Sequence, residues 1–224
     1  MTVEKDICLI DDLNNYLEML PKWSADGIDH INELAGFIVA DNQTLFNLQF
    51  KKMLVRCVAA TTGKKPNNHC FVLRGKLAIG KTRFLHFLCP PFLHKNESYL
   101  SMDIEQLQER LTSFDKGIIA SLIQLSFINI EGISSPSDLK ELFEIDEVTV
   151  HEFGESLSYP KTVNLLGTTN DTNLAEAEFG CLVFDVKSII HDNGGVQGYN
   201  QNINIDLVWS QAYFLYHNGF DYNP

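Results

Sequence analysis

Positively charged residues are scarce in this sequence, and arginine is absent from its second half. The 224 residues include 17 lysines and arginines against 29 aspartates and glutamates, which gives a formal net charge of −12. The four arginines are Arg56, Arg74, Arg83 and Arg110. A protein that binds nucleic acid on its own presents a basic face, so this charge argues against that class. It does not exclude an acidic ring helicase, in which only a few pore residues need to be basic.

Long apolar runs, a secretion signal and a disulfide pattern are also lacking. No apolar stretch approaches the roughly 18 to 20 residues that a membrane span needs, and the first residues do not have the form of a secretory signal. The cysteines are odd in number, scattered and mostly set among apolar neighbours; they are Cys8, Cys57, Cys70, Cys89 and Cys181. Such usage is typical of reduced core thiols, so we expect a cytoplasmic protein without a membrane partner.

The length of 224 residues suits one sizeable α/β domain, or one domain with a helical extension. Residues 1–66 carry three apolar stripes at helical spacing, which predict an N-terminal helical segment; the second stripe is Ile31, Leu34, Ala35 and Ile38. Residues 67–224 alternate buried-strand patterns with helical ones, as is typical of a mainly parallel central sheet. We therefore expect a P-loop NTPase core, of ASCE/AAA+ type, in this second range.

Residues 75–82 carry the most informative pattern, because they satisfy every position of G-x-x-x-x-G-K-[ST]. An apolar run precedes them and a helical pattern follows, which is the setting in which this motif wraps a triphosphate. Backbone N–H groups and the helix N-terminus would face the phosphates, and the lysine would reach the β- and γ-phosphates. The sequence therefore predicts binding of ATP with Mg²⁺ by Gly75, Ala78, Ile79, Gly80, Lys81, Thr82 and Arg83, with the Thr82 hydroxyl on the metal.

Such a site also needs an acidic residue at the tip of a neighbouring strand, and two candidates compete. Asp146 follows an apolar run, but Ser135, Pro136 and Asp138 have the features of a helix start, so that run continues a helix. Glu131 follows the strand pattern of residues 127–130, and we favour it as the carboxylate on the Mg²⁺ side.

The order of these segments resembles virulence-associated protein E, a phosphate-loop ATPase family of mobile elements and phage-like islands. This family is similar in turn to primase-helicases and superfamily III helicases. The resemblance spans about residues 11–220 and rests on residues 73–87, 128–131, 139–142, 148–151, 167–170 and 205–215. It implies phosphate and Mg²⁺ roles for Lys81 and Thr82, and makes Asn170 a polar sensor that could orient the attacking water. Glu131 stands where the family has Asp, and Gly132 where it has the catalytic Glu.

The chain departs from the family pattern at its cations. An arginine expected before the sensor strand is Lys161, another expected after Val150 is His151, and the Arg-Arg-Phe-like element is missing. Arginine fingers contribute about 10³ to 10⁵ in rate, so we expect a nucleotide-binding module whose hydrolysis is weak or absent. Two alternatives remain open. One is an active oligomeric ATPase or helicase that uses Lys161, Lys140 or a partner's residue, and the other is a non-catalytic interaction protein.

Two charged stretches bear on nucleic acid as a partner. Residues 144–155 stand where a superfamily III helicase has a DNA-contacting hairpin, but their five acids would repel phosphate, so we expect a solvated acidic turn. The basic stretch consists of Lys51, Lys52, Arg56, Lys64 and Lys65, for which a solvated face is favoured over a phosphate contact. We therefore expect weak nucleic-acid binding, or binding only within a homo-oligomer or a larger replication assembly.

Overall fold

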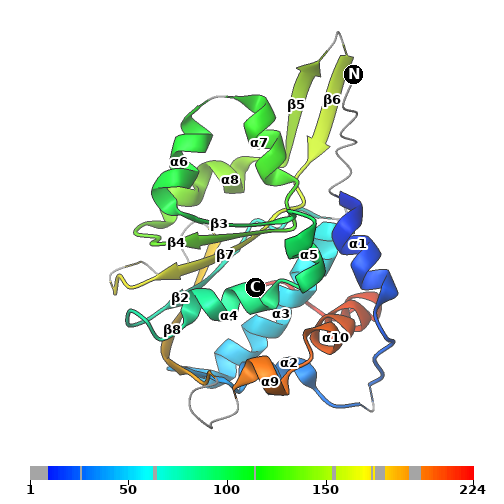
Figure 1. The fold of residues 1–224 in the computed structure, drawn as a ribbon, viewed down its shortest axis with the longest axis vertical. Helices are drawn as coiled ribbons and strands as arrows, with labels where there is room; N and C mark the ends of the chain where they lie inside the picture. The colour runs from blue at the N-terminus through cyan, green and yellow to red at the C-terminus, as the bar shows by residue number, and fades with distance from the viewer. Residues whose placement is uncertain are drawn as a thin grey trace.

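A computed structural model describes residues 10–25, 27–62, 65–113, 115–152, 155–172, 174, 180–191 and 198–224. Cys8 and Lys64, named above, lie outside the described residues. Within the described part of the chain, six strands form one sheet and two more form a separate hairpin (Figure 1).

The six-stranded sheet has the order β1-β8-β2-β7-β4-β3, and each neighbouring pair except β1 and β8 is parallel. Its strands are β1 (Ile38–Ala40), β2 (Cys70–Arg74), β3 (Tyr99–Asp103), β4 (Phe127–Glu131), β7 (Asn164–Thr169) and β8 (Cys181–Ile189). The prediction of a mainly parallel sheet is confirmed. Because β7 lies between β2 and β4, the carboxyl ends of these three strands meet at one edge.

Helices cover both faces of this sheet (Figure 1). One face carries α1 (Ile10–Met19), α2 (His30–Ala35), α3 (Gln43–Thr61), α4 (Lys81–Leu88), α5 (Pro91–Lys95), α9 (Tyr199–Asn202) and α10 (Ile205–His217). The other carries α6 (Ile104–Thr112), α7 (Lys116–Ile123), a 3₁₀ turn (Pro136–Leu139) and α8 (Lys140–Glu144). Strand β2 is therefore buried on both sides, which explains why it forms a continuous apolar run in the sequence.

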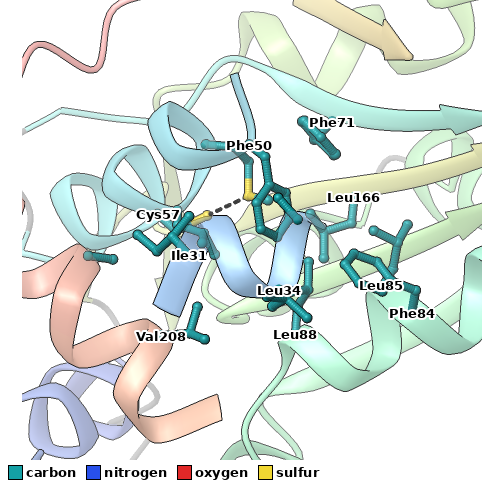
Figure 2. Packing of buried hydrophobic residues seen from close by; sticks show 14 of the residues in the cluster. Ile31, Leu34, Phe50, Cys57, Phe71, Phe84, Leu85, Leu88, Leu166 and Val208 are labelled. Carbon is teal, nitrogen blue, oxygen red and sulfur yellow. Dashed lines mark hydrogen bonds between the residues drawn. The ribbon is translucent and has the colours of Figure 1, made fainter. Parts of the chain in front are cut away.

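The larger core lies on the α3 face. Figure 2 shows side chains of α2, α3, α4 and α10 meeting there with Phe71 of β2 and Leu166 of β7. Residues from both predicted ranges, 1–66 and 67–224, share this core, and the backbone N–H of Ile31 in α2 donates to Gln211 Oε1 of α10 at 3.0 Å.

One element of the N-terminal range differs from its prediction. Ile38 was expected in a helical stripe, but α2 ends before Gly36 and Ile38 lies in β1, which pairs antiparallel with β8. In this strand an exposed Val39 separates the buried Ile38 and Ala40. A strand of three residues is too short for its alternation to be told from a helical stripe.

The acidic turn expected at residues 144–155 is also wrong, because most of this segment is a β-hairpin. Strands β5 (Glu147–Glu152) and β6 (Glu155–Pro160) pair antiparallel and project from the body (Figure 1). The half-buried Val148 and the buried Val150 alternate with the polar Thr149 and the exposed His151, and Val148 packs against the core. This alternation is the strand signal that the acidic charges obscured.

Candidate functional site

A pocket of about 310 Å³ lies where the carboxyl ends of β2, β7 and β4 meet. Ligands of open parallel sheets characteristically bind at this edge. The lining residues come from three separate segments: Leu77, Ala78, Gly80, Lys81, Thr82 and Arg83; Glu131 and Gly132; Thr168, Thr169 and Asn170. The structure thus gathers seven of the nine predicted site residues around one cavity. The other two, Gly75 and Ile79, belong to the same motif loop, residues 75–80 between β2 and α4.

The backbone of the motif loop depends on its glycines. Gly80 has φ +91°, and Ala78 also has a positive φ of 62°. A Cβ atom on Gly75 would lie 2.4 Å from the carbonyl oxygen of Val186, so the loop could not approach β8 with any other residue. The N–H of Gly75 donates to the Thr169 carbonyl at 3.1 Å, which fixes the start of the loop against β7.

Lys81 is held inside the loop by neutral oxygens. Its Nζ donates to the carbonyls of Gly75 and Lys76 at 2.8 and 2.7 Å, and to Asn170 Oδ1 at 2.9 Å. The side chain is 6 % exposed, and burial lowers the pKa of its ammonium group. No carboxylate among the described residues pairs with it, so its charge is available to an anion in the pocket.

Glu131 and Asp146, the competing acidic residues, lie at opposite edges of the sheet. Glu131 ends β4 beside the pocket, in register with Thr168 of β7. Asp146 follows α8 and accepts a hydrogen bond from Asn68 Nδ2 at 3.3 Å, near the amino end of β2. Helix formation from Ser135 is confirmed, since the 3₁₀ turn and α8 occupy the run before Asp146. Of these two acids, Glu131 lines the pocket and Asp146 does not.

Gly132, beside Glu131, carries no side chain toward the pocket, and its backbone has a positive φ of 75°. Its N–H donates to the Thr168 carbonyl at 3.0 Å, and a Cβ atom there would have no neighbour within 4 Å. Space for a larger side chain is therefore present, but the backbone conformation disfavours any L-residue.

The ion pair between Arg74 and Asp185, at the start of the motif loop, was not predicted from the sequence. Arg74 Nε and Nη2 donate to the two carboxylate oxygens of Asp185 at 2.5 and 2.6 Å, and Nη1 donates to the Leu174 carbonyl at 2.8 Å. Hydrogen bonding from Arg74 lowers the pKa of the Asp185 carboxyl despite an opposing contribution from burial. Arg74 is the last residue of β2 and aligns with Asp185 in β8, so only the strand pairing could have revealed this contact.

His191 is a second residue that sequence reasoning missed. Its Nε2 lies 2.9 Å from the Ile79 carbonyl oxygen, and its ring packs edge-on against Tyr199. A Cβ atom on Gly80 would overlap this imidazole at 1.8 Å. His191, which follows β8 in the chain, therefore contacts the end of the motif loop at Ile79 and Gly80. No motif in the sequence indicates this role.

Lys161 is not positioned as a replacement for an arginine finger. It is 2 % exposed, does not line the pocket, and donates to the Leu142 carbonyl and to Asn68 Oδ1 at 2.5 and 2.7 Å. Burial lowers the pKa of its ammonium group to about 8. Lys140 lies on α8 and pairs with Glu144 at 3.6 Å. Neither lysine lines the pocket, so neither supplies a cation to the site of its own chain in this structure.

Comparison with known proteins gives a likeness of fold. No protein-family model matches the chain, and no curated protein matches it. Among solved structures, the apo A form of the C-terminal region of NrS-1, residues 305–718, superposes with a TM-score of 0.53 at 12 % sequence identity. The match covers 88 % of this chain and 45 % of that one, so the chain spans less than half of the matched structure. Within the described residues, no helix has both the length and the apolar character that crossing a membrane requires.

Proposed function

We propose that this chain binds Mg·ATP in the pocket at the carboxyl ends of β2, β7 and β4, as a module related to the ATPase of mobile-element primase-helicases. The observation that carries the proposal is the placement of Lys81, which touches the motif loop and Asn170 at once and has no carboxylate partner among the described residues. The primase-helicase relation comes from the sequence resemblance, and the fold likeness to the NrS-1 region is compatible with it.

The side chains around the pocket fit such a ligand. Magnesium takes oxygen ligands in a compact shell, and the Thr82 hydroxyl and Glu131 carboxylate line the same cavity. Bound Mg²⁺ would neutralise part of the phosphate charge. The N–H groups that open α4 face an anion favourably, and Lys81 can exchange its carbonyl partners for phosphate oxygens. Arg74 and Asp185 hold the base of the loop, so we assign them a positioning role.

We further propose that hydrolysis is weak or absent. Asn170 can orient a water molecule, but no side chain at position 132 can take its proton. Among the described residues, Arg83 is the only arginine that lines the pocket, and it belongs to α4, the helix that follows the motif loop. An arginine finger would have to come from a second subunit or another member of a replication assembly.

Thermal unfolding with and without Mg·ATP tests the binding proposal. At 100 times its dissociation constant, a ligand stabilises the folded state by roughly 2.7 kcal/mol, or roughly 5 to 10 °C for a chain of this size. The melting temperature of the wild type should rise accordingly, and that of Lys81→Ala should not. Lys95→Ala, which removes an exposed lysine from α5, is the matched control and should respond like the wild type. Absence of a shift at millimolar nucleotide would refute the proposal.

A further inference from the structure

A second cavity lies at the opposite edge of the sheet, near the amino end of β2. It has a volume of about 80 Å³ and lies between the end of α3, residues 65–69 and the last residues of the chain. Its lining includes Arg56, Lys65, Asn68, His69, Tyr222 and Asn223. Pockets for organic ligands have volumes of about 300 to 1,000 Å³, so this cavity has room for a small ion and not for a nucleotide.

Arg56 is the unusual member of this lining. Its side chain is 5 % exposed, and its Nη1 donates to the Tyr222 carbonyl at 2.9 Å. Its Nε and Nη2 atoms are buried and have no hydrogen-bond partner. A buried guanidinium with unpaired N–H groups is costly unless an acceptor is supplied.

Comparison with Arg74 shows what the unpaired groups can hold. In Arg74 the same two atoms, Nε and Nη2, donate hydrogen bonds to the two oxygens of the Asp185 carboxylate. These two parallel N–H groups are the edge of the guanidinium that binds an oxyanion through two bonds. The same edge of Arg56 is buried beside the cavity, and none of the described residues supplies an oxyanion to it.

The surroundings of Arg56 are positive. Lys65 and His69 share the lining, and Lys52 donates to the Asn223 carbonyl. Burial, followed by the charges of Arg56, Lys65 and Lys161, lowers the pKa of His69 to about 4, so its imidazole is neutral at pH 7 and the positive charge comes from the other residues. Among the described residues no aspartate or glutamate side chain lines the cavity, and the nearby carboxylates of Asp146 and Asp221 accept hydrogen bonds from Asn68 and Asn223.

We propose that this cavity binds one phosphate group, with two of its oxygens accepting the Nε–H and Nη2–H of Arg56 and with Lys65 closing over it. The phosphate is either inorganic phosphate or a phosphodiester of a nucleic-acid strand. Because the Nε and Nη2 atoms have almost no exposed surface in this structure, binding requires the cavity to open, a movement that we assign to Tyr222 and Asn223 in its lining. These residues bind Lys52 and Arg56 only through neutral carbonyls, which are weaker acceptors than a phosphate oxygen.

Nuclear magnetic resonance of protein labelled with ¹⁵N-arginine tests this site directly. Only four Nε–H signals are possible, and Arg→Lys variants at positions 56, 83 and 110 assign them. The Lys81→Ala protein should be used, so that the motif loop does not compete for phosphate. Inorganic phosphate at constant ionic strength should move the Arg56 signal to a saturating value, while the Arg74 signal, already paired with Asp185, stays in place.

A short unphosphorylated oligonucleotide separates the two sources of phosphate. Movement of the Arg56 signal at lower concentration than with inorganic phosphate supports a nucleic-acid phosphodiester, and movement with inorganic phosphate alone supports the free ion. An Arg56 signal that stays still with both, up to tens of millimolar phosphate, overturns the proposal.

Stability supplies an independent readout in the same Lys81→Ala background. Phosphate should raise the melting temperature, and Arg56→Met should abolish that rise. Lys140→Met, which removes one exposed cation on α8, should keep it. A rise that persists in Arg56→Met contradicts the site, and the resonance measurement decides if that variant does not fold.

Discussion

Each of the two edges of the central sheet has a buried cation, and the two cations differ in their hydrogen-bond partners. At the carboxyl edge, Lys81 is surrounded by backbone carbonyls and one amide, with Glu131 lining the same pocket. At the amino edge, Arg56 lines a much smaller cavity and keeps two N–H groups unpaired. The first edge has the size, glycines and mixed charge suited to a metal–nucleotide complex. The second has room and charge for a single anion.

The two buried arginines sharpen this contrast. Arg74 and Arg56 are 7 % and 5 % exposed, yet only Arg74 has a carboxylate on its Nε and Nη2 edge. The pair with Asp185 anchors the strand end that leads into the motif loop, whereas two N–H groups of Arg56 have no hydrogen-bond partner among the described residues. Burial alone does not tell a structural arginine from a binding one; the partners of its N–H groups do.

The largest effect is expected from breaking the Arg74–Asp185 pair. Asp185→Asn leaves the buried guanidinium without its counter-charge, so the free energy of unfolding should fall by about 1.5 to 3 kcal/mol in urea titrations near pH 7. Lys187→Gln, which removes an exposed partner of Asp41, is the control and should change it by less than about 1 kcal/mol.

The same pair predicts a pH dependence. Because the folded state lowers the pKa of the Asp185 carboxyl, the stabilisation is present above the unfolded carboxyl pKa, near 3.9. It is lost as the pH falls through the lower, folded value. The stability difference between wild type and Asp185→Asn should therefore shrink as the pH is lowered below about 4. A difference that grows with acid would contradict this sign.

A smaller, more specific effect should separate the two acidic candidates. Glu131→Gln should weaken Mg²⁺-dependent nucleotide binding by roughly tenfold or more, which is about 1.4 kcal/mol, because it removes a charged oxygen from the pocket. Asp146→Asn, at the opposite edge, should leave nucleotide affinity unchanged and act only on local stability. Calorimetric titration with Mg·ATP measures the nucleotide affinity of both variants. A loss of affinity in Asp146→Asn and not in Glu131→Gln would contradict the placement of the metal beside Glu131.

Part of the candidate site could be predicted from the sequence, and part of it could not. The motif loop, the Glu131 strand and Asn170 are short local patterns, and each lies where its pattern indicated. Arg74 with Asp185 and His191 with Ile79 depend on strand pairing between residues more than 100 positions apart, which no local pattern encodes. Strand β1 was missed because it has only three residues. The β5–β6 hairpin was missed because its acidic residues suggested a solvated turn.

Nucleic-acid binding is expected to be the weakest of the measurable effects. Of the basic stretch, Lys51 is paired with Asp29 at 2.7 Å, Lys52 donates to the Asn223 carbonyl, and Arg56 could hold one phosphate at most, so few cations remain for a nucleic-acid strand. Fluorescence anisotropy with single- and double-stranded oligonucleotides should show weak binding that is lost between roughly 50 and 200 mM salt. Submicromolar binding at physiological salt, insensitive to charge reversal at Lys51 and Lys52, would instead favour the helicase interpretation.

Restoring an acid at position 132 should not create an efficient enzyme. A glutamate there has room, but φ +75° costs an L-residue about 1 to 2 kcal/mol. Gly132→Glu should therefore leave phosphate release close to the level of the wild type. A large gain in rate would show that a single missing carboxylate, and not the missing arginines, limits the reaction.

The fate of ATP bound to the purified protein tests the account most directly. Labelled Mg·ATP should be mixed with excess protein, and bound nucleotide and released phosphate measured over time in wild type and Lys81→Ala. The account predicts binding that depends on Lys81, with the nucleotide recovered as ATP and phosphate release near background. Failure to bind would contradict the proposed site, and Lys81-dependent turnover above about 1 s⁻¹, within the usual enzyme range, would contradict weak hydrolysis.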